Sequence, residues 1–312
     1  MQYIKNEWIK IWSQKSTWIM LIILLGLVSI VAGISKYFDV DSSTKEVRLQ
    51  ENEKLLNQYN EWLSEEGIAE EDKLYYNEEI AKLQYRIDND LPSPDTVTFT
   101  EQMELSITIS VALISIFAIV VAAGIISSEF SSGTIKMLLT RPVARWKILL
   151  SKLATTILFS LALLAVSLAF SALLDVLLFG TEKAVTLSIL DGQVVAQEVE
   201  NTYLENIPFS FASLLMTIIF AFMIGSLFSS STLAVSLSLF ILLMGQTATL
   251  FISQYNFAKY IWFANDIGQF GPGNSPIIED LTFTFSIIIN IIYAIVFLAI
   301  TFIAFMKRDV TA

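Results

Sequence analysis

Six long apolar runs constrain this chain of 312 residues more than any other feature of its sequence. A bilayer core of about 30 Å requires about 20 apolar residues in a helix, and each run is that long. The runs predict an all-α polytopic membrane protein with six transmembrane helices. We expect the helices at residues 17–38, 102–127, 147–179, 207–228, 232–252 and 284–306, the fourth and fifth together filling 207–252.

The charged residues indicate the orientation of these helices. The N-terminal segment, the connection between the second and third runs and the tail 307–312 together carry ten basic and three acidic residues. In contrast, segment 39–101 carries 17 acids and six bases, and segment 180–206 carries five acids and one base. Because Lys and Arg are enriched in cytoplasmic loops, we expect both termini in the cytoplasm and both acidic segments outside it, with 180–206 as an outer loop.

Segment 39–101 shows helical periodicity rather than the pattern of a passive loop. Apolar residues recur at helical spacing on both sides of Gly67, and Pro92 and Pro94 follow the second stretch. The periodic positions are Leu55, Tyr59 and Trp62, then Tyr76, Ile80, Leu83 and Ile87. This pattern predicts an extracytoplasmic helical hairpin. The hairpin serves either as a solvated spacer or as a lid or contact surface for a substrate or partner.

The first sixteen residues form another amphipathic segment. Ile4, Trp8, Ile11 and Trp12 fall on one helical face, and lysines fall elsewhere. Tryptophan and lysine before a membrane span suit the membrane interface, so segment 1–16 predicts an interfacial amphipathic helix. The simpler interpretation is a positively charged anchor.

Segment 253–283 joins the last two runs on the outer side. Its first half is aromatic but too short to span, and glycines and prolines follow. We therefore expect a re-entrant or interfacial segment that ends in a turn-rich loop.

Composition excludes several classes of chemistry. The chain has no Cys and no His, so thiolate metal sites and histidine acid–base catalysis are absent. No Gly is followed directly by Lys, which excludes a Walker A phosphate loop. The net charge of −11 argues against nucleic acid as a partner. We expect neither enzymatic activity nor a cofactor or metal site in this chain, and an intramembrane lipid-modifying enzyme is disfavoured.

The cytoplasmic segment 128–146 has the most specific pattern. Gly133 and Thr134 are expected to break the second helix after Glu129, and Pro142 to stop a short amphipathic helix. The residues that make this pattern are Glu129, Gly133, Thr134, Ile135, Leu138, Leu139, Arg141, Pro142 and Arg145. A short cytoplasmic helix between two spans is a surface that a partner can push.

This pattern, Glu-x-x-x-Gly-Thr, then Leu-Leu, then Arg-Pro, resembles the signature of type-2 ABC exporter permeases of bacteria. The N-terminal pattern Lys5-x-Glu7-x-x-Lys10-x-Trp12 and the six-span topology are also similar to that family. The likeness covers essentially the whole chain, although the acidic outer hairpin is not universal in the family. The systems most similar in style export drugs, antimicrobial peptides or sodium.

The resemblance implies roles for these residues. Glu129, Gly133 and Thr134 match the turn into a coupling helix, Ile135, Leu138 and Leu139 match that helix, and Arg141, Pro142 and Arg145 match the return into the third span. The family works as two permeases, identical or different, with two copies of a separate ATPase that binds ATP and magnesium. The implied location is the bacterial cytoplasmic membrane, where the permease also contacts lipid.

Small and hydroxylated residues on the second and fifth spans, with a polar residue on the sixth, suggest a transport route. We expect the route along a surface shared by two permeases, because small residues allow close helix approach. The candidate pathway residues are Ser110, Ser115, Gln246 and Asn290. The competing interpretation is helix packing within one subunit. A second function remains open, namely a membrane-bound sensor or scaffold whose outer hairpin binds a ligand.

Overall fold

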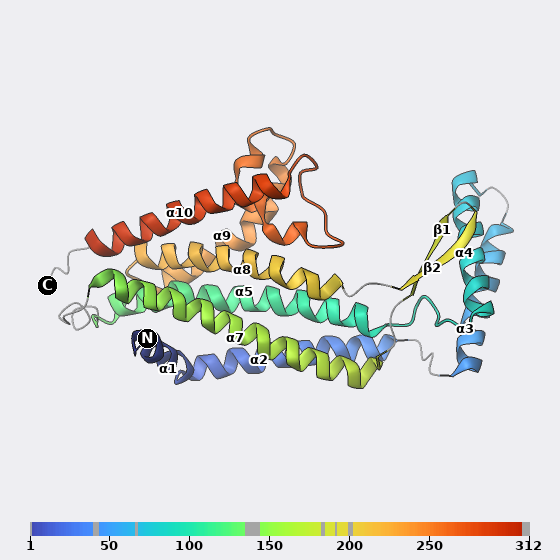
Figure 1. Cartoon of the computed structure of the whole chain (residues 1–312), viewed down its shortest axis with the longest axis horizontal. Helices are drawn as coiled ribbons and strands as arrows, with labels where there is room; N and C mark the ends of the chain where they lie inside the picture. The colour runs from blue at the N-terminus through green and yellow to red at the C-terminus, as the bar shows by residue number, and fades with distance from the viewer. Residues whose placement is uncertain are drawn as a thin grey trace. The chain divides into compact units, whose positions relative to one another are not determined.

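The computed structural model describes residues 2–39, 44–65, 68–134, 144–181, 185–190, 192–198 and 202–307. Six of its helices are long and apolar enough to cross a membrane, which confirms the all-α polytopic fold class. These helices, seen in Figure 1, are α2 (Lys15–Phe38), α5 (Phe99–Ser131), α7 (Arg145–Phe179), α8 (Thr202–Leu227), α9 (Ser231–Ile252) and α10 (Phe283–Lys307). Most begin or end a few residues beyond the predicted limits.

The chain divides into two compact units. Unit 1 comprises Met1–Val28, Ile107–Phe170 and Thr202–Ala312, and unit 2 comprises Ser29–Ser106 and Ser171–Asn201. The long helices α2, α5 and α7 contribute residues to both units.

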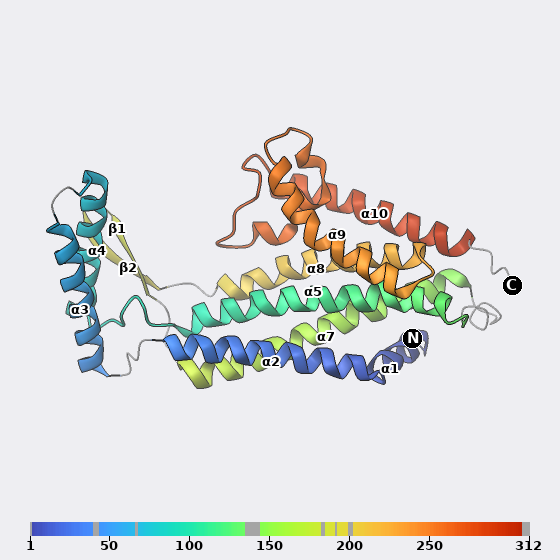
Figure 2. The ribbon, with the colours of Figure 1, turned by 180° about the vertical axis from the view of Figure 1, so that it is seen from behind.

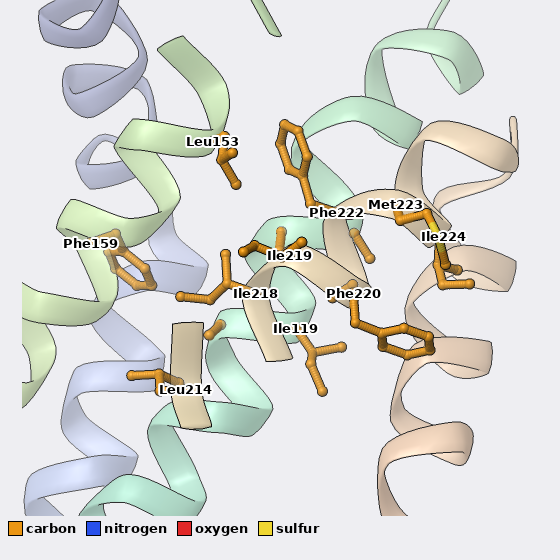
Figure 3. Packing of buried hydrophobic residues seen from close by; sticks show 14 of the residues in the cluster. Ile119, Leu153, Phe159, Leu214, Ile218, Ile219, Phe220, Phe222, Met223 and Ile224 are labelled. Atoms are coloured by element: carbon orange, nitrogen blue, oxygen red, sulfur yellow. The ribbon is translucent and has the colours of Figure 1, made fainter. Parts of the chain in front are cut away.

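A continuous hydrophobic core holds unit 1 together. Figure 3 shows Phe159 of α7, Ile119 of α5 and Ile218 of α8 within one cluster of buried side chains. In two opposite views α8 lies beside α5 (Figures 1 and 2). The backbones come so close that a Cβ atom at Gly225 of α8 would overlap the backbone of Ala123 on α5. Only glycine therefore fits at position 225.

The aromatic segment between α9 and α10 folds into unit 1. It forms three short 3-10 helices, η1 (Ala258–Tyr260), η2 (Trp262–Asn265) and η3 (Ile267–Phe270). Trp262 is buried against Phe220 of α8 and Phe297 of α10, with ring centroids 5.1 and 5.7 Å away. This part of segment 253–283 thus packs among the helices of unit 1.

In unit 2, helices α3 (Lys45–Leu63) and α4 (Glu70–Asp88) form the predicted helical hairpin. Tyr59 and Trp62 of α3 pack against Tyr76 of α4, with ring centroids 5.9 Å apart in both pairs. Near the other end, the Arg48 guanidinium donates two hydrogen bonds of 3.1 Å to the Asp90 carboxylate. Rings and an ion pair thus fasten the hairpin at both ends.

Segment 180–206, for which we expected a loop, contains a two-stranded antiparallel sheet. Strand β1 (Val185–Leu190) pairs with β2 (Gln193–Glu198), and Gly192 between them has a φ of 77°. This left-handed conformation costs a glycine no steric strain. The sheet packs on α4, where Arg86 donates a hydrogen bond of 3.4 Å to the Val185 carbonyl.

Candidate functional site

Four charged side chains meet in unit 1, where α1 (Gln2–Trp12) contacts α5 and α7. Lys152 Nζ of α7 lies 2.6 Å from Glu129 Oε1 of α5 and 3.0 Å from Glu7 Oε1 of α1. Lys10 Nζ lies 3.1 Å from the same Glu129 oxygen. Two ammonium groups therefore balance two carboxylates in what we call the Lys152 cluster, consisting of Glu7, Lys10, Glu129 and Lys152.

The four members of the cluster differ in burial. The Lys152 side chain is 0% exposed and that of Glu129 6%, whereas Lys10 is 50% exposed. Dehydrating a buried charge costs several kcal/mol, so a buried ion pair persists only with close, well-placed partners. Lys152 has two such partners, and it is the central group of the cluster.

Helical spacing on α1 presents Glu7 and Lys10 on the side that also buries Ile11. The Thr17 hydroxyl donates to the Ile11 carbonyl at 2.6 Å and closes the turn between α1 and α2. The Trp12 ring packs against Phe159 of α7 at 5.9 Å. Of the predicted interfacial face, Trp8, Ile11 and Trp12 pack on the core of unit 1, and Ile4 is half-buried. This face therefore contacts protein.

Glu129 lies at the base of the segment predicted to couple to a partner. Helix α5 ends at Ser131, and Gly133 follows with a φ of 71°, where glycine avoids strain. The Ser132 and Thr134 hydroxyls lie 2.9 Å apart. The helix thus ends near the predicted break. The other proposed coupling residues, Ile135, Leu138, Leu139, Arg141 and Pro142, lie outside the described residues.

Arg145 begins α7 and links it to α10. Its Nη1 donates a hydrogen bond of 3.1 Å to the Met306 carbonyl near the end of α10. Helix α7 starts two residues before the expected limit at residue 147, and Lys152 lies within it, directly before the apolar stretch that begins at Leu153.

A cavity of about 220 Å³ adjoins the Lys152 cluster in unit 1. Glu7 and Lys10 line it from α1, Gly124 and Ser128 from α5, and Ser231 from the start of α9. The cavity thus brings polar groups of the cluster next to apolar helix surface.

The candidate pathway residues have different environments. The Ser110 hydroxyl is buried and forms a hydrogen bond of 2.6 Å with the Ser167 hydroxyl of α7. Ser115 donates to the Val111 carbonyl within its own helix at 2.8 Å, and Gln246 is exposed on α9. Ser110 thus joins two helices of one chain, whereas Gln246 is placed where another molecule can reach it.

Asn290 of α10 is buried beside the aromatic segment. Its amide donates to the carbonyls of Asn265 at 2.6 Å and Ser286 at 2.8 Å. It also lines an apolar cavity of about 410 Å³ between α8 and α10, together with Phe209 and Met216. The structure does not group the four pathway residues around one cavity among the described residues.

The sequence pattern placed Lys152 only among the cytoplasmic charges and Glu7 only in the N-terminal pattern, and it predicted no contact between them. A lysine inside a membrane helix is costly and generally has a carboxylate partner, which was the available signal. The signal was overlooked because Lys152 directly precedes the apolar stretch that begins at Leu153 and was counted with the cytoplasmic charges. Glu7 was the expected type of partner, but 145 residues separate it from Lys152.

Comparisons with known proteins place these features in a family. Residues 71–311 match the family model described as "Protein of unknown function (DUF2705)". The chain is 38% identical to "Uncharacterized protein YhcI" of Bacillus subtilis (strain 168), over 99% of both chains. It is 34% identical to "Uncharacterized membrane protein YdbK" of the same organism, over 64% of this chain and 78% of the relative. With six apolar helices, the chain is a multi-pass membrane protein.

Proposed function

Because this chain belongs to the DUF2705 family of proteins of unknown function, we propose its activity from its own residues: it is the membrane permease subunit of an ATP-driven exporter. A separate ATPase subunit binds ATP and magnesium and supplies the energy. The Lys152 cluster is the observation that carries this proposal, because it joins α1, α5 and α7 at the base of segment 128–146.

In this proposal the cluster transmits force. The ATPase docks on segment 128–146 through Ile135, Leu138 and Leu139, the apolar residues that the sequence pattern assigns to docking. A displacement of that segment moves Glu129 at the end of α5. Lys152 is held to Glu129 at 2.6 Å and to Glu7 at 3.0 Å, so α7 and α1 move with α5. An uncharged packing contact would slip more easily, since it lacks this directional pairing.

The proposed substrate is amphiphilic or hydrophobic, such as a drug, a peptide antibiotic or a lipid-like molecule. The apolar cavity of about 410 Å³ between α8 and α10 supports this class, because its wall offers few polar groups to a hydrated ion. Two permease subunits and two ATPase subunits would form the complete exporter. Gln246, exposed on α9, is available to a second subunit.

The proposed location is the bacterial cytoplasmic membrane, with both termini in the cytoplasm. The distribution of Lys and Arg supports this orientation. It puts segment 128–146 and the Lys152 cluster on the side where ATP is available.

A sensor or scaffold is the second candidate function. The α3–α4 hairpin favours it, since Leu74 and Tyr75 are 64% and 54% exposed on a strongly acidic segment. A ligand or partner of the hairpin would then explain its size.

Paired substitutions separate the two functions. We expect Leu138→Asp with Leu139→Asp to abolish co-purification of ATP-hydrolysing activity with the tagged chain in mild detergent. The matched control, Leu49→Asp with Leu74→Asp, changes two exposed leucines of the hairpin and should leave that activity in place. A wild-type chain that purifies from its native membrane without ATPase activity or an ATPase subunit would reject the exporter.

A further inference from the structure

A second polar cluster lies in unit 2, on α5 and α7. Asp175 is 0% exposed, and its Oδ2 accepts a hydrogen bond of 3.0 Å from the Ser106 hydroxyl. The Gln102 amide donates to the same hydroxyl oxygen at 3.3 Å. Ser171 precedes Asp175 by one helical turn and faces the same side of α7. We call these four residues, each buried to 99% or more, the Asp175 cluster.

Three oxygens of this cluster lack a hydrogen-bond partner within the part of the chain that is described. They are Asp175 Oδ1, Gln102 Oε1 and Ser171 Oγ. The first two, as carboxylate and amide oxygens, can only accept. An unpaired buried acceptor costs about 1–3 kcal/mol, and more when it is charged. The cluster therefore presents buried acceptor oxygens, one of them on a carboxylate, that a positive group would satisfy.

Protein side chains do not supply that group among the described residues. Asp175 takes part in none of their ion pairs. Lys36, at the end of α2, forms an ion pair with Asp39, with 2.7 Å between Nζ and Oδ2. Its Nζ also lies 5.4 Å from the centre of the Phe179 ring. An isolated carboxylate at such a site is unfavourable unless something neutralises it.

We propose that the Asp175 cluster binds one small monovalent cation of the sodium type. Carboxylate, amide and hydroxyl oxygens are the ligands that hard cations prefer, and water completes their coordination. One carboxylate balances one positive charge, which favours a monovalent over a divalent ion. A proton is the competing occupant, but it would bridge only two oxygens, whereas a metal ion can contact several.

This site does not depend on the proposed export function, and its test needs no ATPase. The purified full chain in detergent is titrated with NaCl against choline chloride at constant ionic strength, and the thermal midpoint is recorded. A ligand that binds only the folded state raises that midpoint in a saturable way. We expect saturable stabilisation by Na⁺ in the wild type and none in Asp175→Asn.

Two further variants keep the test informative. Ser171→Ala retains the carboxylate, and we expect it to raise the half-saturating Na⁺ concentration about 10–100-fold, as loss of a supporting ligand does elsewhere. Glu104→Gln removes an exposed carboxylate of α5 and should titrate as the wild type does. If Asp175→Asn fails to fold, binding of radioactive Na⁺ to Ser171→Ala and Glu104→Gln decides the question.

Three outcomes would overturn the proposal. The first is a wild-type midpoint that is insensitive to Na⁺. The second is an equal Na⁺ effect in Asp175→Asn. The third is stabilisation by acidification in choline buffer that Na⁺ does not reproduce, which would assign a proton to Asp175.

Discussion

The Lys152 cluster and the Asp175 cluster solve the same problem in opposite ways. Both bury ionisable groups in membrane helices, and both involve α5 and α7. In the Lys152 cluster two cations face two anions, so the protein itself balances the charge. In the Asp175 cluster one carboxylate accepts a hydrogen bond from the Ser106 hydroxyl and has no ion-pair partner among the described residues.

This difference separates a structural connection from a binding site. A balanced cluster is insensitive to small ions and holds its helices in one arrangement. An unbalanced cluster changes its net charge with whatever it binds. Substitutions that remove charge should therefore have opposite effects on the stability of the two clusters.

The largest effect is expected for Lys152→Met. This change leaves two carboxylates buried beside an uncharged side chain, and breaking a buried pair in this way costs about 3–5 kcal/mol. Unfolding by sodium dodecyl sulfate or heat measures the loss.

Two controls sharpen this prediction. Lys10→Met removes a half-exposed partner, for which we expect a loss below about 1 kcal/mol. The triple change Lys152→Met, Glu129→Gln and Glu7→Gln removes all the buried charge and should recover more than half of the lost stability. Equal losses for Lys152→Met and Lys10→Met would contradict the central role of Lys152.

Asp175→Asn should have a smaller effect of the opposite sign. In choline buffer without Na⁺, the change removes an uncompensated charge and adds an amide donor for a neighbouring oxygen. We expect a gain of about 1–3 kcal/mol in the free energy of unfolding. The same unfolding assay measures it, and a loss as large as that of Lys152→Met would remove the contrast between the clusters.

The partly exposed pair of Arg48 and Asp90 should show the smallest effect. The hydrogen bonds from Arg48 hold the pKa of Asp90 below its ordinary value of 3.8. The pair therefore contributes stability at neutral pH, and the contribution is lost as the pH falls through the lowered pKa of Asp90. We expect Asp90→Asn, which tolerates the φ of 53°, to flatten this dependence.

Digestion of the α3–α4 hairpin by an acid-active protease measures that dependence from about pH 5 to about pH 2. Glu70→Gln serves as the control, because Glu70 is an exposed carboxylate whose ion pair with Lys73 lies within α4. A wild-type cleavage rate with the same pH dependence as that of Asp90→Asn would refute the prediction.

Local patterns were enough to predict most of the helices. The six spans and the α3–α4 hairpin follow from run length and helical periodicity, which neighbouring residues determine. The β1–β2 sheet was missed although Asp191-Gly192 separates two short runs with strand character, a strong signal for a hairpin turn. The acidic residues of segment 180–206 were used only to predict its side of the membrane, and its secondary structure was not predicted.

The contacts that define the two clusters could not be read from local patterns. The contact between Glu7 and Lys152 depends on how α1 packs, and that between Ser106 and Asp175 depends on the register of α5 against α7. In the sequence Asp175 only interrupts an apolar run near its end, which does not reveal a partner. Its hydrogen-bond partner Ser106 lies 69 positions away in sequence.

The contact of Gly225 with Ala123 has a consequence for movement. Two helices whose backbones touch cannot slide past each other without moving apart. Helices α5 and α8 therefore move as one rigid unit. A push at the end of α5 is then carried through to α8 and the aromatic segment packed on it. A residue larger than glycine at position 225 would push α5 and α8 apart. A displacement of one helix would then no longer be passed on to the other.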